Sequence, residues 1–242
     1  GRPAPVVTFS DSTTAPFPPP AAPTTCDAAV AVQAWPAAVS YCRSEAETSA
    51  VAQRHLGLLY AAGYGVEQND RQAAIYLAFA AQDADTVALM EMGRRYEKGL
   101  GVAPDMAKST GAFLNAAELS VKASYPIVAR RYDDGIGVRK NPEIAAKWYQ
   151  RAVADGDVTS MTRLAALYAD GRGVKKDEQR AQQLYSDAAE RRDPEAEYQM
   201  AMMLLSGRRG MARNEDAGRG WLQRAAQQGH PAAIKEMARR KW

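Results

Sequence analysis

The sequence contains few cysteines, few histidines, no long apolar run and little excess of one charge. Its 242 residues include two cysteines and two histidines, and 31 basic side chains stand against 28 acidic ones, which gives a net charge of +3. No stretch reaches the roughly 18 consecutive apolar residues of a membrane-spanning helix. The positive charges are interspersed with negative ones, unlike the clustered basic surface of a nucleic-acid-binding protein. These shortages exclude a transmembrane segment in this chain and argue against a nucleic-acid partner.

The residues that enzymes use are equally scarce. His55 and His230 are isolated, and neither has Cys, Asp or Glu neighbours at the spacing of a metal site or a catalytic triad. Glycine-rich turns such as 63–65 follow expected helices rather than strands, and they lack the lysine and hydroxyl of a phosphate-binding loop. Neighbouring carboxylates, such as those at 155 and 157, fall in turns, where they suit helix capping. The sequence therefore predicts no enzyme, no metal site and no cofactor.

The first 25 residues differ in composition from the rest of the chain. Seven of the 13 prolines lie within residues 1–23. Proline runs favour extended polyproline II, which makes a spacer rather than part of a core. We interpret residues 1–25 as a disordered linker of the kind that follows a removed signal peptide or membrane anchor, which favours a periplasmic or otherwise exported protein. A tail on a cytoplasmic protein is the alternative.

The two cysteines flank a predicted helical hairpin in residues 26–51. A short helix is expected over 27–34; Trp35 precedes a proline and leaves the helical region, and Pro36 suits the first turn of a second helix. Cys26 lies nine residues before this turn and Cys42 seven residues after it, so antiparallel packing brings the two together. We predict a Cys26–Cys42 disulfide, which fits an oxidising compartment. Two buried thiols in a cytoplasmic protein are the alternative.

Glycine carries the clearest pattern, a period of 36 residues. The first glycine of a Gly-x-Gly-Val loop recurs at this spacing as Gly63, Gly99, Gly135, Gly171 and Gly207. The second glycine follows as Gly65, Gly101, Gly137 and Gly173, and arrives one residue late as Gly210. Five loops in register indicate an internal repeat.

Each repeat is predicted to be a pair of antiparallel helices. Between 88 and 98 the apolar residues follow helical spacing, and Gly99 comes where a helix end needs a left-handed residue. A second helix with its own apolar face follows each loop, as at 145–152. Because one pair cannot bury its apolar face alone, the pairs must stack. The predicted fold is all-α, a right-handed superhelical solenoid with a partial repeat at 26–51, five repeats at 52–231 and a capping helix at 232–242.

This pattern resembles the Sel1-like repeat family, a relative of the tetratricopeptide repeats. An alanine, a small residue, a tyrosine and the Gly-x-Gly-Val loop recur in fixed order, best preserved in residues 52–81, 88–117, 161–189 and 196–226. The resemblance implies that the first helix of each pair lines a concave face. It also implies a role as an adaptor in signalling, secretion or cell-wall processes.

Arginines gather on the expected concave face of the second and third repeats, and polar residues continue into the next two. The candidate partner-binding residues are Arg94, Arg95, Arg130, Arg131, Arg163 and Gln199. Like charges on neighbouring helices about 10 Å apart need a counter-charge. One source is internal, from Glu91, Glu97, Asp133 and Asp134. The other is an acidic peptide or domain of a partner.

Taken together, these features predict a non-enzymatic scaffold or adaptor for protein–protein interaction at a bacterial-type cell envelope. Its partner is expected to place an acidic segment in the concave groove. The alternative is a module that binds a cell-wall glycan or an exopolysaccharide chain. Most aromatic residues fall on core positions of the repeat, which weakens the glycan alternative.

Overall fold

A computed structural model describes residues 22–242 of the chain, and the predicted linker at 1–25 lies almost entirely outside them. These residues form thirteen α-helices and one short 3-10 helix, with no strand among them. The predicted all-α class is confirmed. None of the described helices is long and apolar enough to cross a membrane.

The helices follow one another in pairs along the chain. An N-terminal hairpin consists of α1 (Cys26–Ala31) and α2 (Trp35–Glu45). The first helices of the five repeats are α3 (Ala50–Ala62), α5 (Thr86–Lys98), α7 (Tyr125–Asp134), α9 (Val158–Asp170) and α11 (Pro194–Ser206). The second helices are α4 (Asp70–Gln82), α6 (Met106–Glu118), α8 (Pro142–Ala154), α10 (Glu178–Glu190) and α12 (Glu215–Gln227). The last helix is α13 (Pro231–Arg240).

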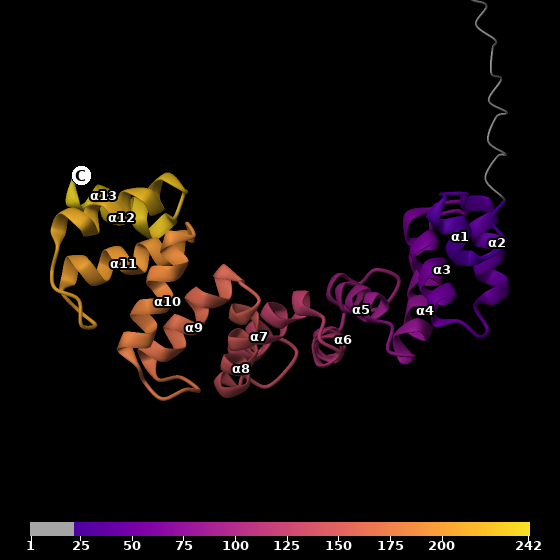
Figure 1. Cartoon of the computed structure of the whole chain (residues 1–242), viewed down its shortest axis with the longest axis horizontal. Helices are drawn as coiled ribbons and strands as arrows, with labels where there is room; N and C mark the ends of the chain where they lie inside the picture. The colour runs from indigo at the N-terminus through magenta and orange to yellow at the C-terminus, as the bar shows by residue number, and fades with distance from the viewer. Residues whose placement is uncertain (1–21) are drawn as a thin grey trace, which may run out of the picture.

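Each helix packs mainly against the helices before and after it, so the pairs stack into a solenoid. Figure 1 shows this order, with α1 and α13 at opposite ends of the array. A continuous cluster of buried apolar side chains runs from Leu89 in the second repeat to Met203 in the fifth. Each pair thus covers the apolar face that its neighbour cannot bury alone.

The first glycine of each loop ends the first helix of its repeat. All five adopt the left-handed conformation, with φ between 63° and 79°. Each second helix then starts after an Asn or Asp side chain that accepts a hydrogen bond from the backbone N–H three residues on, as Asn141 does from Ile144 N. This combination of glycine stop and polar start fixes the turn within every pair.

The second glycine of the loop joins neighbouring repeats. A Cβ atom on Gly101 would overlap the backbone of Asp70 at the start of α4, and one on Gly137 would overlap the carbonyl of Met106 at the start of α6. The loop of one repeat therefore lies directly on the second helix of the repeat before it. Only glycine permits this approach, because its φ is also positive at both positions.

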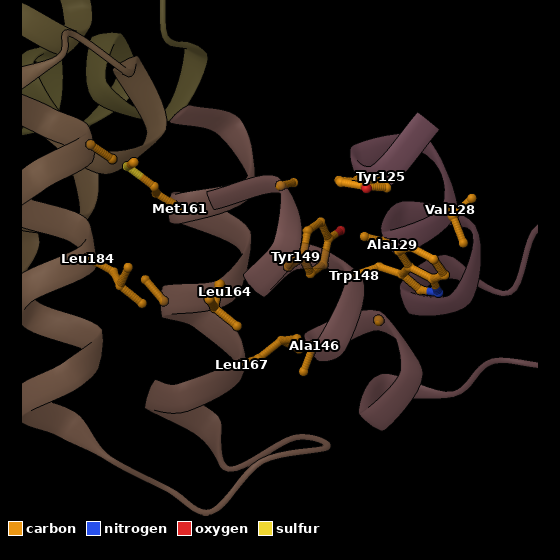
Figure 2. Close-up of a cluster of buried hydrophobic side chains, with 14 of the residues drawn as sticks. Tyr125, Val128, Ala129, Ala146, Trp148, Tyr149, Met161, Leu164, Leu167 and Leu184 are labelled. Carbon is orange, nitrogen blue, oxygen red and sulfur yellow. The ribbon is translucent and has the colours of Figure 1, made fainter. Parts of the chain in front are cut away.

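Within a repeat, a small residue of the first helix receives a large one of the second. A Cβ on Gly93 would lie 2.7 Å from the ring of Phe113. In the third repeat the pair is Ala129 and Tyr149, and Figure 2 shows Tyr149 of α8 within this cluster, with Leu164 of α9 nearby. This close packing holds the two helices of each pair together.

The N-terminal hairpin carries the predicted disulfide. Cys26 and Cys42 are bonded, with their Cα atoms 4.5 Å apart, and both are buried. Cys26 N also donates to Glu45 Oε1 at 3.0 Å. Trp35 differs slightly from expectation, because it forms the first residue of α2 instead of standing before it. The hairpin packs on α3 and covers the first repeat.

The third repeat departs from the others at its beginning. The other first helices start at a position equivalent to residue 122, but α7 starts at Tyr125, and a 3-10 turn over Lys122–Ser124 takes the place of its first turn. Pro126 explains the change, since it has no N–H to donate and is tolerated only in the first turn of a helix. The shortened helix leaves space between α7 and its neighbours.

Candidate functional site

The main candidate site is a pocket of about 550 Å³ between the second, third and fourth repeats. It is called the basic pocket below, and its lining residues are Arg94, Glu97, Lys98, Phe113, Pro126, Ile127, Arg130, Arg131, Tyr149, Asp157, Thr159, Ser160 and Arg163. Most of them belong to the first helices α5, α7 and α9. Five lining side chains are cationic and two are carboxylates, so positive charge is in excess.

Three of the predicted partner-binding residues, Arg94, Arg130 and Arg163, lie exposed on the wall of this pocket. Arg94 contacts Glu91 at 3.2 Å and Arg130 contacts Asp134 at 3.7 Å, both on the same helix. The expected internal counter-charges are therefore present. Exposed pairs of this kind contribute only about 0.2–1 kcal/mol, so they leave the arginines available to a partner.

Two of the five cations of the basic pocket have no counter-charge within residues 22–242. Lys98 and Arg163 take part in none of the ion pairs there, whereas Arg131 is paired with Glu97 at 3.1 Å. The other lining carboxylate, Asp157, caps α9 by accepting from Ser160 N at 2.7 Å. The equivalent capping residues Asp85 and Asp193 bind a side chain of the preceding repeat. Those side chains are Arg54 and Thr162. The equivalent residue beside Asp157 is Pro126, whose side chain cannot donate a hydrogen bond to it.

Of the predicted partner-binding residues, Arg95 and Arg131 are buried and do not lie exposed on this face. Arg95 is 2% exposed. Its Nη1 donates to Asp70 Oδ1 at 3.1 Å and to the carbonyls of Asp70 and Leu100 at 3.3 Å. The guanidinium thus fastens the loop of the second repeat to α4 of the first, and it does not face a partner.

Arg131 has the equivalent place in the third repeat and is 4% exposed. Besides Glu97, its Nη2 reaches Ser109 Oγ at 3.4 Å, and its guanidinium lies over the ring of Phe113. Arg131 also lines the basic pocket. At this position the other repeats bury Leu59, Leu167 and Met203, which identifies it as a core position.

Replacing Arg95 with leucine is expected to change the free energy of unfolding by no more than about 1 kcal/mol. The ion-pair partner of Arg95, Asp70, is 41% exposed and water can solvate its carboxylate, and two other repeats already hold leucine at this position. Urea denaturation measures the change. Binding at the basic pocket should stay intact, because Arg95 does not line it. A loss of binding with unchanged stability would return Arg95 to the list of partner-binding residues.

Gln199 lies on α11, where its Nε2 donates to Glu195 Oε1 at 2.7 Å. It occupies the same repeat position as Arg163, but it does not line the basic pocket. The histidines have local partners: His55 contacts Asp27 at 2.9 Å, and His230 caps α13 and contacts Glu195. Burial, assisted by Arg54, lowers the pKa of His55. No cluster of metal-binding side chains occurs among residues 22–242.

A second, apolar pocket of about 400 Å³ lies on the same face near the N-terminal hairpin. It is lined by Val30, Trp35, His55, Leu58, Leu59, Ala61, Ala62 and Tyr64. The rings of Trp35 and Tyr64 stack there with centroids 4.9 Å apart. The first-helix face is therefore apolar in the first repeat and charged from the second to the fourth.

The sequence profile of the Sel1 repeat matches residues 50–85, 86–114, 128–157, 158–193 and 194–230, which together make up more than half of the chain. The chain belongs to the Sel1 repeat family. Members of this family are generally non-enzymatic scaffolds for protein–protein interaction. The gap in the match, 115–127, contains the altered start of α7 beside the basic pocket.

Solved structures of other Sel1 repeat proteins have the same fold. A Sel1 repeat protein from Oxalobacter formigenes is 29% identical, with a TM-score of 0.73 over 87% of this chain and 86% of that one. The protective antigen c5321 of uropathogenic Escherichia coli, which has an SLR fold, is 25% identical with a TM-score of 0.72 over 86% of this chain. The chain spans about half of that antigen, 47% of its length. No curated protein matches the chain.

Sequence reasoning missed several residues of the basic pocket, and four of them give it its charge, shape and hydroxyl groups. Lys98 adds a cation one turn after Arg94, and Pro126 shortens α7. Tyr149 and Ser160 add hydroxyl groups from α8 and α9. The available signal was a comparison between Sel1 repeats, because each of these residues differs from what most other copies carry at its position.

Proposed function

We propose that this Sel1 repeat protein is a non-enzymatic scaffold whose basic pocket binds an acidic segment of a partner protein. The observation that carries the proposal is the charge of the lining, five cations against two carboxylates, with Lys98 and Arg163 free of ion pairs within residues 22–242. A pocket of this size suits a few side chains of a partner. Charge complementarity then provides both attraction and selectivity.

The carboxylates that an enzyme would need are engaged in the structure of the repeats. Asp133 is buried and bound to Arg172 at 3.0 Å, and Asp155 contacts Lys122 at 2.6 Å. Asp85 and Asp157 cap helices. These contacts support a structural role for the acidic turns and hence a binding function rather than catalysis.

A location in the cell envelope is part of the proposal. The Cys26–Cys42 disulfide supports it, because such bonds persist in oxidising compartments. The similar proteins from Oxalobacter formigenes and Escherichia coli are bacterial, for which the periplasm is the matching compartment. The proline-rich composition of residues 1–25 is consistent with a spacer between such a domain and an anchor.

Reversing two charges tests the proposed site. The double variant Arg94→Glu, Arg130→Glu is expected to bind a fluorescein-labelled hexaglutamate peptide about 30-fold more weakly. Each site loses an attraction of about 0.5 kcal/mol and gains a repulsion of similar size, about 2 kcal/mol in total. Fluorescence anisotropy at low ionic strength measures the affinity, and added salt should weaken wild-type binding.

The matched control is Lys147→Glu, Arg180→Glu. It changes the total charge equally on the exposed faces of α8 and α10, outside the basic pocket. This variant should bind nearly as well as the wild type. Equal losses in the two variants would mean that only net charge matters, and the proposed site would then be wrong.

Direct binding of a cell-wall glycan is a second candidate, favoured by one observation. Tyr64 is 52% exposed and stacks on Trp35 beside the apolar pocket, an arrangement on which a sugar ring packs well. Cosedimentation with purified peptidoglycan distinguishes the two candidates. Sedimentation that is lost in Tyr64→Ala but kept in the arginine double variant would favour the glycan.

A further inference from the structure

Two buried hydroxyl groups of the basic pocket have no hydrogen-bond partner among the described residues. They are Tyr149 Oη on α8 and Ser160 Oγ on α9. Tyr149 is 2% exposed and Ser160 1% exposed, and both line the pocket. A buried hydroxyl without a partner destabilises the folded state, so most buried hydroxyls are paired. Two orphaned hydroxyls in one charged pocket indicate that their acceptor comes from outside the chain.

Packing does not require either hydroxyl. The positions equivalent to Tyr149 in the other repeats are occupied by the buried residues Leu77, Phe113, Tyr185 and Leu222. The positions equivalent to Ser160 are occupied by Ala52, Ala88, Ser124 and Ala196, all of them buried. Apolar side chains therefore fill three of the four equivalent positions in each set. The third and fourth repeats add a polar atom to a core position at the point where their helices border the pocket.

The equivalent side chains in neighbouring repeats have different surroundings. Burial raises the pKa of the Tyr185 phenol to about 12 and Arg209 acts against this effect, while Ser124 Oγ donates to the carbonyl of Val121. Arg172 lies in the loop one repeat before Arg209, but it binds Asp133 at 3.0 Å instead. Tyr149 is thereby left without the arginine that its counterpart has.

Tyr149 remains a hydrogen-bond donor at physiological pH. Burial raises the pKa of its phenol far above the ordinary value, and the nearby carboxylate of Asp133 adds to the effect. Ser160 Oγ is likewise free to donate. Arg163 and Arg130 are close enough to act electrostatically on the phenol, so they also favour negative charge beside it.

From this geometry we infer that Tyr149 Oη and Ser160 Oγ form the floor of the site and donate hydrogen bonds to one inserted carboxylate of the acidic segment. The inference rests on the proposed function and names the atoms that make it selective. An ionised carboxylate accepts several hydrogen bonds and donates none, so it can accept from both hydroxyl groups at once. Arg130 and Arg163, which line the pocket and are exposed, supply the charge.

Removing single oxygen atoms tests this floor. Tyr149→Phe and Ser160→Ala are each expected to weaken binding of the labelled hexaglutamate about fivefold to tenfold, because each deletes one donor to a charged acceptor. The dependence of affinity on salt should stay as in the wild type, since no charge is removed. A hexaglutamine peptide, which lacks the carboxylates, should not bind. The melting temperature of Tyr149→Phe should not fall, because the lost hydroxyl has no partner within residues 22–242.

The matched control is Tyr185→Phe, which removes the equivalent hydroxyl of a buried tyrosine outside the basic pocket and should leave hexaglutamate affinity unchanged. Suppose that Tyr149→Phe and Ser160→Ala bind like the wild type while Arg94→Glu, Arg130→Glu does not. The inferred role of the two hydroxyl groups is then wrong, and the proposed function stands. If the wild type fails to bind hexaglutamate at all, both are wrong. A lower melting temperature for Tyr149→Phe would reveal an internal partner and overturn the inference.

Discussion

Replacing Gly137 with alanine is expected to destabilise the protein by about 4 kcal/mol. Gly137 has φ +69°, a left-handed conformation that costs a residue with a Cβ about 1–2 kcal/mol. The new methyl group would also overlap the carbonyl of Met106 at the start of α6, and overpacking of this kind costs about 1–3 kcal/mol. At about 3 °C per kcal/mol for a chain of this size, the melting temperature should fall by about 12 °C.

The fifth repeat provides the control. Gly210 is the second glycine of its loop and has φ +78°, but no atom lies within 4 Å of the place where a Cβ would stand. Gly210→Ala therefore carries only the conformational cost, about 1–2 kcal/mol, and should lower the melting temperature by about 3–6 °C. Calorimetry of the two variants compares them directly. Equal losses would show that contact between neighbouring repeats contributes nothing at Gly137.

Gly137→Ala should also weaken binding at the candidate site. Gly137 joins the third repeat to the second, and the basic pocket is built from α5 and α6 of the second repeat, α7 and α8 of the third and α9 of the fourth. In a solenoid each repeat is positioned only by its neighbours. A displaced joint therefore moves Arg94 relative to Arg130, and we expect weaker hexaglutamate binding in Gly137→Ala although residue 137 lies outside the pocket.

Glycine explains why the fold could be predicted from the sequence. A positive φ, and a backbone that touches a neighbouring backbone, leave only one acceptable residue type at Gly101 and Gly137. The presence of glycine at these positions therefore reveals the geometry of the loops, and it recurs at a spacing that equals the repeat length. The cysteine pairing was predictable for a similar reason, since the turn around Trp35 sets which residues of the hairpin face each other.

The site was only partly predictable, because exposure of an arginine depends on what surrounds it. Arg94 and Arg95 are adjacent in sequence, yet Arg94 is exposed and Arg95 is buried. The leucines at 59 and 167 mark position 95 as a core position, and charge alone suggested the opposite. The buried position tolerates arginine because Asp70 and a carbonyl of the loop are within reach of its guanidinium.

The lack of an internal partner for the hydroxyl groups of the pocket could not have been predicted from the repeat. Tyr149 and Tyr185 occupy the same position, but the loop arginine of the following repeat binds Asp133 in one case and acts on the phenol of Tyr185 in the other. This difference depends on Asp133, a residue of the preceding repeat in sequence. Interactions between repeats of this kind are a property of the folded array and leave no periodic mark in the sequence.

Removing the disulfide is the second large effect that we expect. The bond closes a loop with a sequence separation of 16 residues, for which chain entropy predicts about 3 kcal/mol of stabilisation. Helix α1, which the bond attaches to α2, has only six residues, too few to be stable alone in water. Cys26→Ser, Cys42→Ser or treatment with a reductant should therefore release α1 from α2 and α3. Hydrogen exchange of residues 26–45 should accelerate about 100-fold, the factor that corresponds to roughly 3 kcal/mol.

The effect should stay local, and this locality separates the disulfide from the binding site. Because a solenoid is stabilised by contacts between neighbours, exchange in α9–α13 should be unchanged when the bond is broken. The basic pocket contains no residue of α1–α4, so hexaglutamate binding should also persist. Unchanged exchange in α1 after reduction would mean that packing of Cys26, Ala29 and Cys42 is sufficient without the bond. Mass spectrometry before and after reduction confirms that the measured protein began with the disulfide formed.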